Sequence, residues 1–132
     1  MSSVALLTFT RNDVARALPM LRKVRPHVAE LVVVDSSDPP DLARHQPALA
    51  SLGATVVRAV PVGYVDVLRP FGTSLVRSEW VFLVEADEIP TGELCDALPR
   101  LVEGAAYDLP RLESGLGSWT RSPVAGRRSA PP

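Results

Sequence analysis

Four short apolar runs alternate with segments of helical spacing, and this alternation constrains the fold more than any other feature of the sequence. The run at residues 80–84 is apolar at every position and rich in branched and aromatic side chains, as is typical of a strand buried on both faces. Strands that alternate with helices in this way predict βαβ units and a parallel sheet. We therefore expect an α/β fold of three layers, with a Rossmann-like, mostly parallel sheet between helices. The expected strands are residues 4–9, 31–34, 54–60 and 80–84.

Apolar residues recur at helical spacing between these runs, although prolines interrupt the pattern. Thr10, Asn12 and Asp13 can each cap the first helix, and Pro19 predicts either a kink in that helix or a late start. Gly53 is expected to end the second helix. The expected helices are residues 14–24, 41–52, 63–77 and 91–102.

One folded domain accounts for most of the 132 residues. From about Thr120 the chain consists of Arg, Ser, Pro, Ala and Gly without an apolar period, which is typical of disorder. We therefore expect a domain over residues 1–115 and a disordered tail over residues 116–132, with residues 109–113 as a candidate for one more short strand.

Charge and cysteine content exclude several classes of partner. The formal net charge is -1, from 14 basic and 15 acidic residues, which gives no support to a nucleic-acid or anionic-membrane surface. Cys95 is the single cysteine and can form no internal disulfide, which fits a reducing compartment. No apolar run approaches the roughly 18 residues of a membrane span. We expect a cytoplasmic protein without a membrane span or a nucleic-acid partner.

Polar residues follow three of the four expected strands, at the point where each strand ends. Thr8 and Thr10 belong to the first strand, Asp35 ends the second, and Glu85 and Asp87 follow the fourth. In open α/β sheets ligands bind at the carboxyl ends of the strands. This convergence predicts a ligand site at one edge of the sheet.

Acidic residues are concentrated after the fourth strand, at Glu85, Asp87 and Glu88. Three carboxylates this close repel one another unless they are solvated or share a cation, and a hard divalent ion bound by one or two carboxylates and by substrate phosphates would supply one. The alternative is a solvated acidic turn that leads into a helix with Thr91 as its N-cap. Spacing alone does not separate these two interpretations.

These stretches resemble the amino-terminal, nucleotide-sugar-binding half of the family 2 glycosyltransferases of the GT-A fold. Residues 6–11 are similar to the family's first strand and its Pro-Thr-Tyr-Asn-Arg turn, and residues 31–35 to the strand that ends in a base-recognising aspartate. Gly63 and Arg69 match a Gly-x-x-x-x-x-Arg segment ahead of the metal-binding strand. Residues 80–88 match the strand that carries the family's Asp-x-Asp, with Glu in place of the first Asp.

The resemblance covers about residues 3–115, and it implies a fold that is incomplete at the carboxyl end and a chain that is apparently truncated. The family's acceptor-binding half, which normally supplies the catalytic base, has no counterpart after Glu113. The catalytic residue therefore stays unknown from the sequence, and we expect the chain alone to transfer sugar poorly or not at all.

The resemblance also implies a role for each candidate residue in binding a UDP- or GDP-type sugar with Mn²⁺ or Mg²⁺. Asp87 would bind the metal, and Glu85 would bond a ribose hydroxyl or reach the metal through water. Asp35 would accept an N–H of a uracil-like base. The remaining candidates are Thr8 and Thr10 beside the base and Arg69 on the diphosphate.

Three functions remain open from the sequence. The first is a metal-dependent glycosyltransferase, inverting if active, that transfers the sugar to a hydroxyl of an unidentified glycan, lipid or protein acceptor. The second is a non-catalytic nucleotide-sugar-binding module, or a remnant without the acceptor half. The third is a sugar nucleotidyltransferase-like protein, although the glycine-rich basic loop of that class is missing after the first strand.

Overall fold

A computed structural model of the chain describes residues 3–61, 65–98, 107–108 and 118–121. In these residues one six-stranded sheet has the order β3-β2-β1-β4-β6-β5. The first four strands in this order are mutually parallel, whereas β6 pairs antiparallel with both β4 and β5. The strands are β1 Val4–Thr10, β2 Glu30–Asp35, β3 Thr55–Arg58, β4 Trp80–Leu83, β5 Tyr107–Asp108 and β6 Ser118–Arg121.

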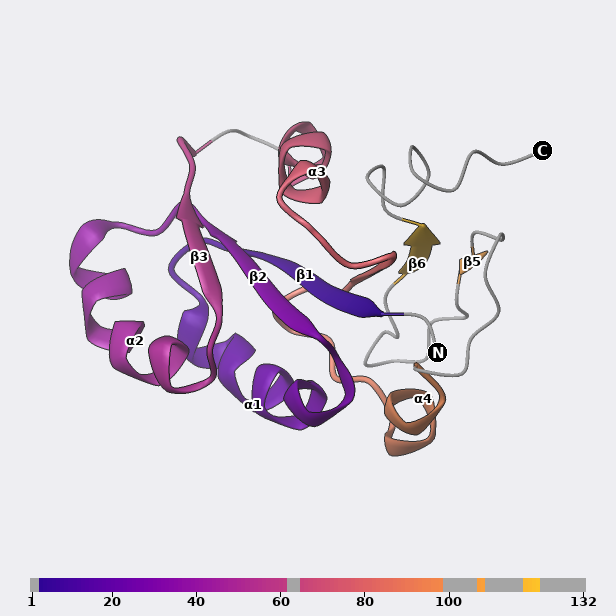
Figure 1. Cartoon of the computed structure of the whole chain (residues 1–132). Helices are drawn as coiled ribbons and strands as arrows, with labels where there is room; N and C mark the ends of the chain where they lie inside the picture. The colour runs from indigo at the N-terminus through magenta and orange to yellow at the C-terminus, as the bar shows by residue number, and fades with distance from the viewer. Residues whose placement is uncertain (1–2, 62–64, 99–106, 109–117, 122–132) are drawn as a thin grey trace.

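The helices lie on both sides of this sheet, so the predicted α/β class and its layers are confirmed. Helices α1, α2 and α4 lie on one side and α3 on the other (Figure 1). Their bounds are α1 Val14–Val24, α2 Pro39–Ser51, α3 Val65–Ser74 and α4 Gly92–Ala97, and a 3-10 turn at Arg25–His27 follows α1.

Alternate residues of the parallel strands are buried against the two helical layers, as the period of two along a strand requires. Leu6 and Val33 belong to the larger core under α1, α2 and α4, whereas Leu7 and Val34 belong to the smaller core on the α3 side. Thr8, Thr10 and Asp35 have the same parity as the first pair, so they lie on the α1 side of the sheet.

Several predicted boundaries need correction. Helix α1 begins at Val14 and contains Pro19, so the late start is excluded. Helix α2 begins at Pro39, two residues before the predicted start at residue 41, because the fixed φ of proline suits the first turn of a helix. Gly53 ends α2 as predicted, with φ of 69°. Thr91 caps α4 as predicted, since its Oγ1 accepts the Leu94 N–H at 3.2 Å.

The predicted strands and helices of the second half are longer than the observed ones. The third and fourth strands end at Arg58 and Leu83, and α3 ends at Ser74. Helix α4 is observed to Ala97, with Leu98 as its C-cap, and residues 99–102 of the predicted helix lie outside the described ranges. The candidate strand at 109–113 also lies outside them.

Strand β6 lies in the segment predicted as a disordered tail, so that prediction is wrong for Ser118–Arg121. Trp119 is the register partner of Phe82 in the pairing of β6 with β4. The edge of β4 that faces away from β1 has backbone N–H and C=O groups that can pair with another extended segment. Trp and Thr favour extended backbone. The sheet therefore extends past residue 115, and residues 122–132 lie outside the described ranges.

Among the described residues, no helix has both the length and the hydropathy that a membrane span requires.

Candidate functional site

The strand order places a topological switch point between β1 and β4. The chain runs from β1 to β2 and β3 on one side of the sheet, and it then returns to β4 on the other side of β1. Loops leave the carboxyl ends of the two strands in opposite directions at such a point, which opens a crevice between them. A ligand site is therefore expected at the ends of β1 and β4.

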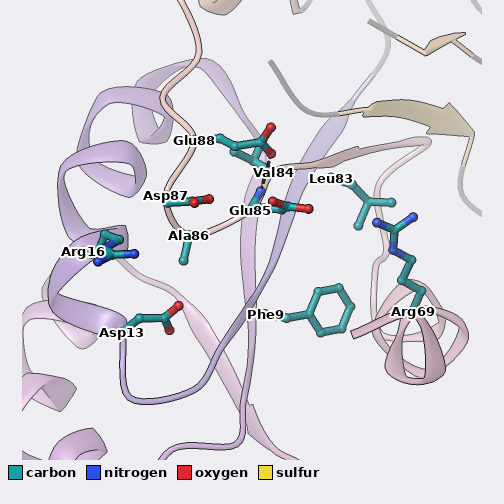
Figure 2. Close-up of a pocket in the computed structure, with 10 residues that line it drawn as sticks. All are labelled: Phe9, Asp13, Arg16, Arg69, Leu83, Val84, Glu85, Ala86, Asp87 and Glu88. Carbon is teal, nitrogen blue, oxygen red and sulfur yellow. Dashed lines mark hydrogen bonds between the residues drawn. The ribbon is translucent and has the colours of Figure 1, made fainter. Parts of the chain in front are cut away.

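A pocket of about 320 Å³ lies at this switch point. Its floor is the loop that leaves β4, and its walls come from the two helical layers. Figure 2 shows Asp13 and Arg16 of the α1 side opposite Arg69 of α3, with Phe9 between them. The complete lining is Phe9, Asp13, Arg16, Arg69, Leu83, Val84, Glu85, Ala86, Asp87 and Glu88.

The acidic loop after β4 is held in a closed turn. Glu88 is 3% exposed, and its Oε1 accepts the Glu85 N–H at 2.8 Å. The Glu88 N–H in turn donates to the Glu85 carbonyl at 3.0 Å. Asp87 is exposed within this turn and lines the pocket. The turn therefore uses Glu88 as an internal acceptor and presents Asp87 to a ligand.

Asp13 and Arg16 form the α1 wall of the pocket. Asp13 stands at the N-cap position of α1, and its Oδ1 accepts the Arg11 N–H at 2.8 Å. Burial raises the pKa of the Asp13 carboxyl above its ordinary value, although the bond from Arg11 and the charge of Arg16 act in the opposite direction. An added cation in the pocket would offset that cost of burying the charge.

The α3 wall depends on a close approach between Gly72 and Phe9. A Cβ atom at Gly72 would lie 2.8 Å from Cζ of Phe9 and 3.2 Å from Cδ1 of Leu7. Because no side chain stands at this position, α3 packs directly on β1. This packing brings half-buried Arg69, one turn earlier on the helix, to the pocket that the Phe9 ring lines.

A second polar group lies at the same sheet edge but outside this pocket lining. The Asp35 side chain is fully buried, and its Oδ1 accepts the hydroxyls of Thr10 and Ser37, each at 2.6 Å. Its Oδ2 accepts the Ser37 N–H at 3.1 Å and a charged hydrogen bond from Nη1 of Arg58. Burial acts to raise the pKa of Asp35, but the bonds from Ser37, Thr10 and Arg58 outweigh it and leave the pKa below its ordinary value. We call Thr10, Asp35, Ser37 and Arg58 the Asp35 cluster.

Thr8 lies deeper in the sheet than the Asp35 cluster. Its side chain is fully buried, and its Oγ1 has no hydrogen-bond partner among the described residues. It is not part of the pocket lining.

The residues predicted for the site thus form two groups, and Thr8 belongs to neither. Arg69, Glu85 and Asp87 come together in the pocket, whereas Thr10 and Asp35 lie in the Asp35 cluster. The sequence interpretation did not assign Asp13, Arg16 or Phe9 to the site. Asp13 and Arg16 stand three residues apart in the first turn of the helix after β1, and a helix start beside a switch point was the signal that could have found them.

A divalent metal fits this pocket only in combination with a ligand. No group of three His, Cys, Asp or Glu side chains within the described ranges is arranged to hold a metal ion. Mg²⁺ is commonly bound by one or two carboxylates and by substrate phosphates, with water completing the shell. The exposed carboxylates of Asp87 and Glu85 suit that arrangement.

No model of a known protein family matches the sequence. The chain is similar to rickettsial proteins that are named uncharacterized glycosyltransferases. It is 32% identical over 99 residues to one from Rickettsia felis, an alignment that covers 74% of this chain and 33% of the relative. For one from Rickettsia prowazekii the values are 29% over 98 residues, with 74% and 32% covered. The chain therefore spans about a third of the length of the curated relatives that it matches.

Solved structures place the fold. Residues 1–349 of TarS from S. aureus match 96% of this chain with a TM-score of 0.68 and 14% identity, over 49% of that structure. The mannosyltransferase PcManGT from Pyrobaculum calidifontis, solved in complex with GDP-Man and Mn²⁺, matches 84% of this chain with a TM-score of 0.63 and 21% identity, over 36% of that structure. The chain has a glycosyltransferase fold. The glycosyltransferase GlyE from Streptococcus pneumoniae shares it as well, with a TM-score of 0.57.

Proposed function

We propose that the chain is the donor-binding part of a metal-dependent glycosyltransferase, and that it binds a UDP- or GDP-type sugar with Mn²⁺ or Mg²⁺ at the switch-point pocket. The observation that carries the proposal is the pocket itself, which brings the acids of the β4–α4 loop opposite the cation of Arg69. The complex of PcManGT with GDP-Man and Mn²⁺, on the same fold, supports the choice of ligand and metal.

The charges of the pocket explain why such a ligand needs a cation. Four carboxylates and two guanidinium groups line the pocket, so it carries an excess of negative charge. A diphosphate entering alone would be repelled, whereas a divalent ion attracts both the phosphates and the carboxylates. The metal, once bound, supplies charge stabilisation for the leaving nucleoside diphosphate.

Three residues of the pocket lining, and Thr8 outside it, have a role in this proposal. Asp87 holds the metal, and Glu85 bonds a ribose hydroxyl or reaches the metal through water. Arg69 is placed to bind the diphosphate with its planar fork of donors. We assign Thr8 to the base side of the site because its buried hydroxyl has no partner among the described residues.

For the complete reaction we propose family 2 chemistry with inversion at the anomeric carbon and an acceptor hydroxyl as the nucleophile. The order of the motifs along the chain supports this assignment, and so do the relatives named glycosyltransferases. Hydrolysis or transfer of a labelled nucleotide sugar would separate an enzyme from a binding module.

A thermal-shift panel of UDP, GDP, ADP and CDP, each with and without Mn²⁺, tests the proposal. We expect UDP or GDP to stabilise the protein only with Mn²⁺, by about 2.7 kcal/mol at 100 times the dissociation constant. Asp87→Asn should abolish this gain. Glu93→Gln is the matched control, because Glu93 is an exposed acid in the first turn of α4 and is outside the pocket lining.

Two results would contradict the proposal. If none of the four diphosphates shifts the melting temperature with Mn²⁺, the pocket is not a donor site. If Asp87→Asn gains as much as the wild type, Asp87 does not hold the metal.

A further inference from the structure

The hydrogen bonds of Asp35 leave no acceptor position for a ligand. A carboxylate has two oxygens with about four lone-pair positions. In this structure each oxygen already accepts two hydrogen bonds, Oδ1 from Thr10 and Ser37 hydroxyls and Oδ2 from Ser37 N–H and Arg58. The side chain is also fully buried. A nucleotide base could reach it only by displacing one of the chain's own donors.

The Asp35 cluster joins segments that are far apart in the sequence. Thr10 ends β1, Asp35 ends β2 and Arg58 ends β3. The parallel register sets Thr10 beside Asp35 and Asp35 beside Arg58. One carboxylate therefore links the carboxyl ends of three neighbouring strands.

A relay of hydrogen bonds connects this cluster to the start of α1. Oγ of Ser37, which donates to Asp35, accepts the Asn12 N–H at 2.8 Å. Asn12 then pairs with Asp38 twice, since its Oδ1 accepts the Asp38 N–H at 2.9 Å and its Nδ2 donates to Oδ2 of Asp38 at 3.3 Å. Asn12 has a φ of 58°, a left-handed conformation that costs energy in most residues and that these bonds hold in place.

The relay ends beside the pocket. Asp13 follows Asn12 directly and is the N-cap of α1, and Arg16 stands three residues further on. Both line the pocket opposite Arg69 (Figure 2). The backbone angle at Asn12 thus determines where the α1 wall stands.

We propose that Asp35 is a positioning residue, which ties residues 10–13 to residues 35–38 and thereby holds Asp13 and Arg16 on the pocket wall without contacting the nucleotide base. The predicted effect of Asp35 on ligand binding rests on the proposed function. The claim that Asp35 fixes the position of the α1 wall does not rest on it. It departs from the role that the family resemblance implies for Asp35.

The two roles of Asp35 predict different ligand selectivity. A residue that reads the base changes the ratio of affinities for different nucleotides when it is altered. A residue that positions the wall should weaken all nucleotides by the same factor, because the pocket that the wall lines is the proposed site of the diphosphate and the metal, which they share. The ratio of the UDP and GDP dissociation constants separates the two.

The test uses Ser37→Ala together with Asp35→Asn, because a variant of the buried acid can fail to fold. Ser37→Ala removes the hydroxyl that joins Asp35 to Asn12 and leaves the Asp35 carboxylate in place. Amide hydrogen exchange without ligand should show the Asn12 amide exchanging at least about tenfold faster in Ser37→Ala, with Glu93→Gln like the wild type. With Mn²⁺ present, UDP and GDP should both bind about 3- to 10-fold more weakly to Ser37→Ala, with their ratio unchanged, since one lost hydrogen bond contributes roughly 1 kcal/mol.

Each outcome decides the inference. Unchanged exchange at Asn12 would overturn the relay, and a changed ratio of UDP to GDP affinity in Asp35→Asn would overturn the exclusion of a base contact. If the wild type binds no nucleotide, the proposed function fails by itself. Hydrogen exchange at Asn12 in Asp35→Asn, which keeps the Ser37 hydroxyl, then still decides whether Asp35 holds the α1 wall.

Discussion

Asp35 and Asp13 lie at the same edge of the sheet, yet their carboxyls are perturbed in opposite directions. Burial acts to raise the pKa of both. Asp35 accepts bonds from two hydroxyls, an N–H and a guanidinium, which outweigh burial and lower its pKa, whereas Asp13 accepts the Arg11 N–H and keeps a raised pKa. The number of internal donors, and not the depth of burial, therefore separates an acid that holds the fold from an acid that remains available to a ligand.

The largest difference should appear in stability. Asp35→Ala removes one partner of a buried charged pair, which typically costs about 3–5 kcal/mol, and we expect the lower end because Arg58 is 46% exposed and can be solvated. Asp87→Ala alters an exposed acid and should change stability by less than about 0.5 kcal/mol. Urea unfolding followed by circular dichroism measures both. Equal losses in the two variants would show that the distinction between cluster and pocket is wrong.

The pocket wall on the α3 side depends on close packing of Gly72 against Phe9 and Leu7, and Gly72→Ala tests this. The new methyl group would meet Phe9 and Leu7, so we expect a loss of about 1–3 kcal/mol. Gly92→Ala is the control, because a Cβ atom there has nothing within 4 Å. In a Phe9→Ala background the cost of Gly72→Ala should shrink, and an undiminished cost would mean that Phe9 is not the residue displaced.

Asp13→Asn should have the smallest effect, with a sign opposite to that of Asp35→Ala. A raised pKa means that the folded state binds the proton more tightly, so the ionised carboxyl lowers stability as pH rises through the folded pKa. Asn keeps the acceptor for the Arg11 N–H, and the variant should therefore melt higher than the wild type at neutral pH. The gain should vanish as pH falls below the ordinary pKa of Asp.

The pH dependence of Asp35 runs the other way. Its lowered pKa stabilises the fold above the unfolded value of about 3.9, and that stabilisation is lost as pH falls through the folded pKa. The melting temperatures of the wild type and of Asp13→Asn, compared between pH 3 and 7, test the assignment of the raised pKa to Asp13. A stabilising effect of Asp13→Asn that persists at pH 3 would contradict the assignment.

Much of the fold could be predicted from the sequence, because buried parallel strands are continuous apolar runs and the helices between them carry a clear period. The site was harder to predict. The polar residues at the strand ends were visible, but nothing in the spacing indicated that Ser37 and Arg58 would saturate Asp35, since Arg58 reaches it only through the parallel register of β2 and β3. Strand β6 was missed because its partner, β4, lies far away in the sequence.

Equilibrium dialysis of a labelled nucleoside diphosphate, UDP or GDP, tests most directly whether the exposed pocket acids Glu85 and Asp87 bind a ligand through a cation. The wild type, Asp87→Asn and Glu93→Gln would each be dialysed with excess Mn²⁺ and again with EDTA. We predict retention of the nucleotide by the wild type and by Glu93→Gln with Mn²⁺, and at least a tenfold weaker retention with EDTA or in Asp87→Asn, which corresponds to about 1.4 kcal/mol or more. Equal retention by wild type and Asp87→Asn, or retention that EDTA does not reduce, would contradict the assignment of the metal to Asp87.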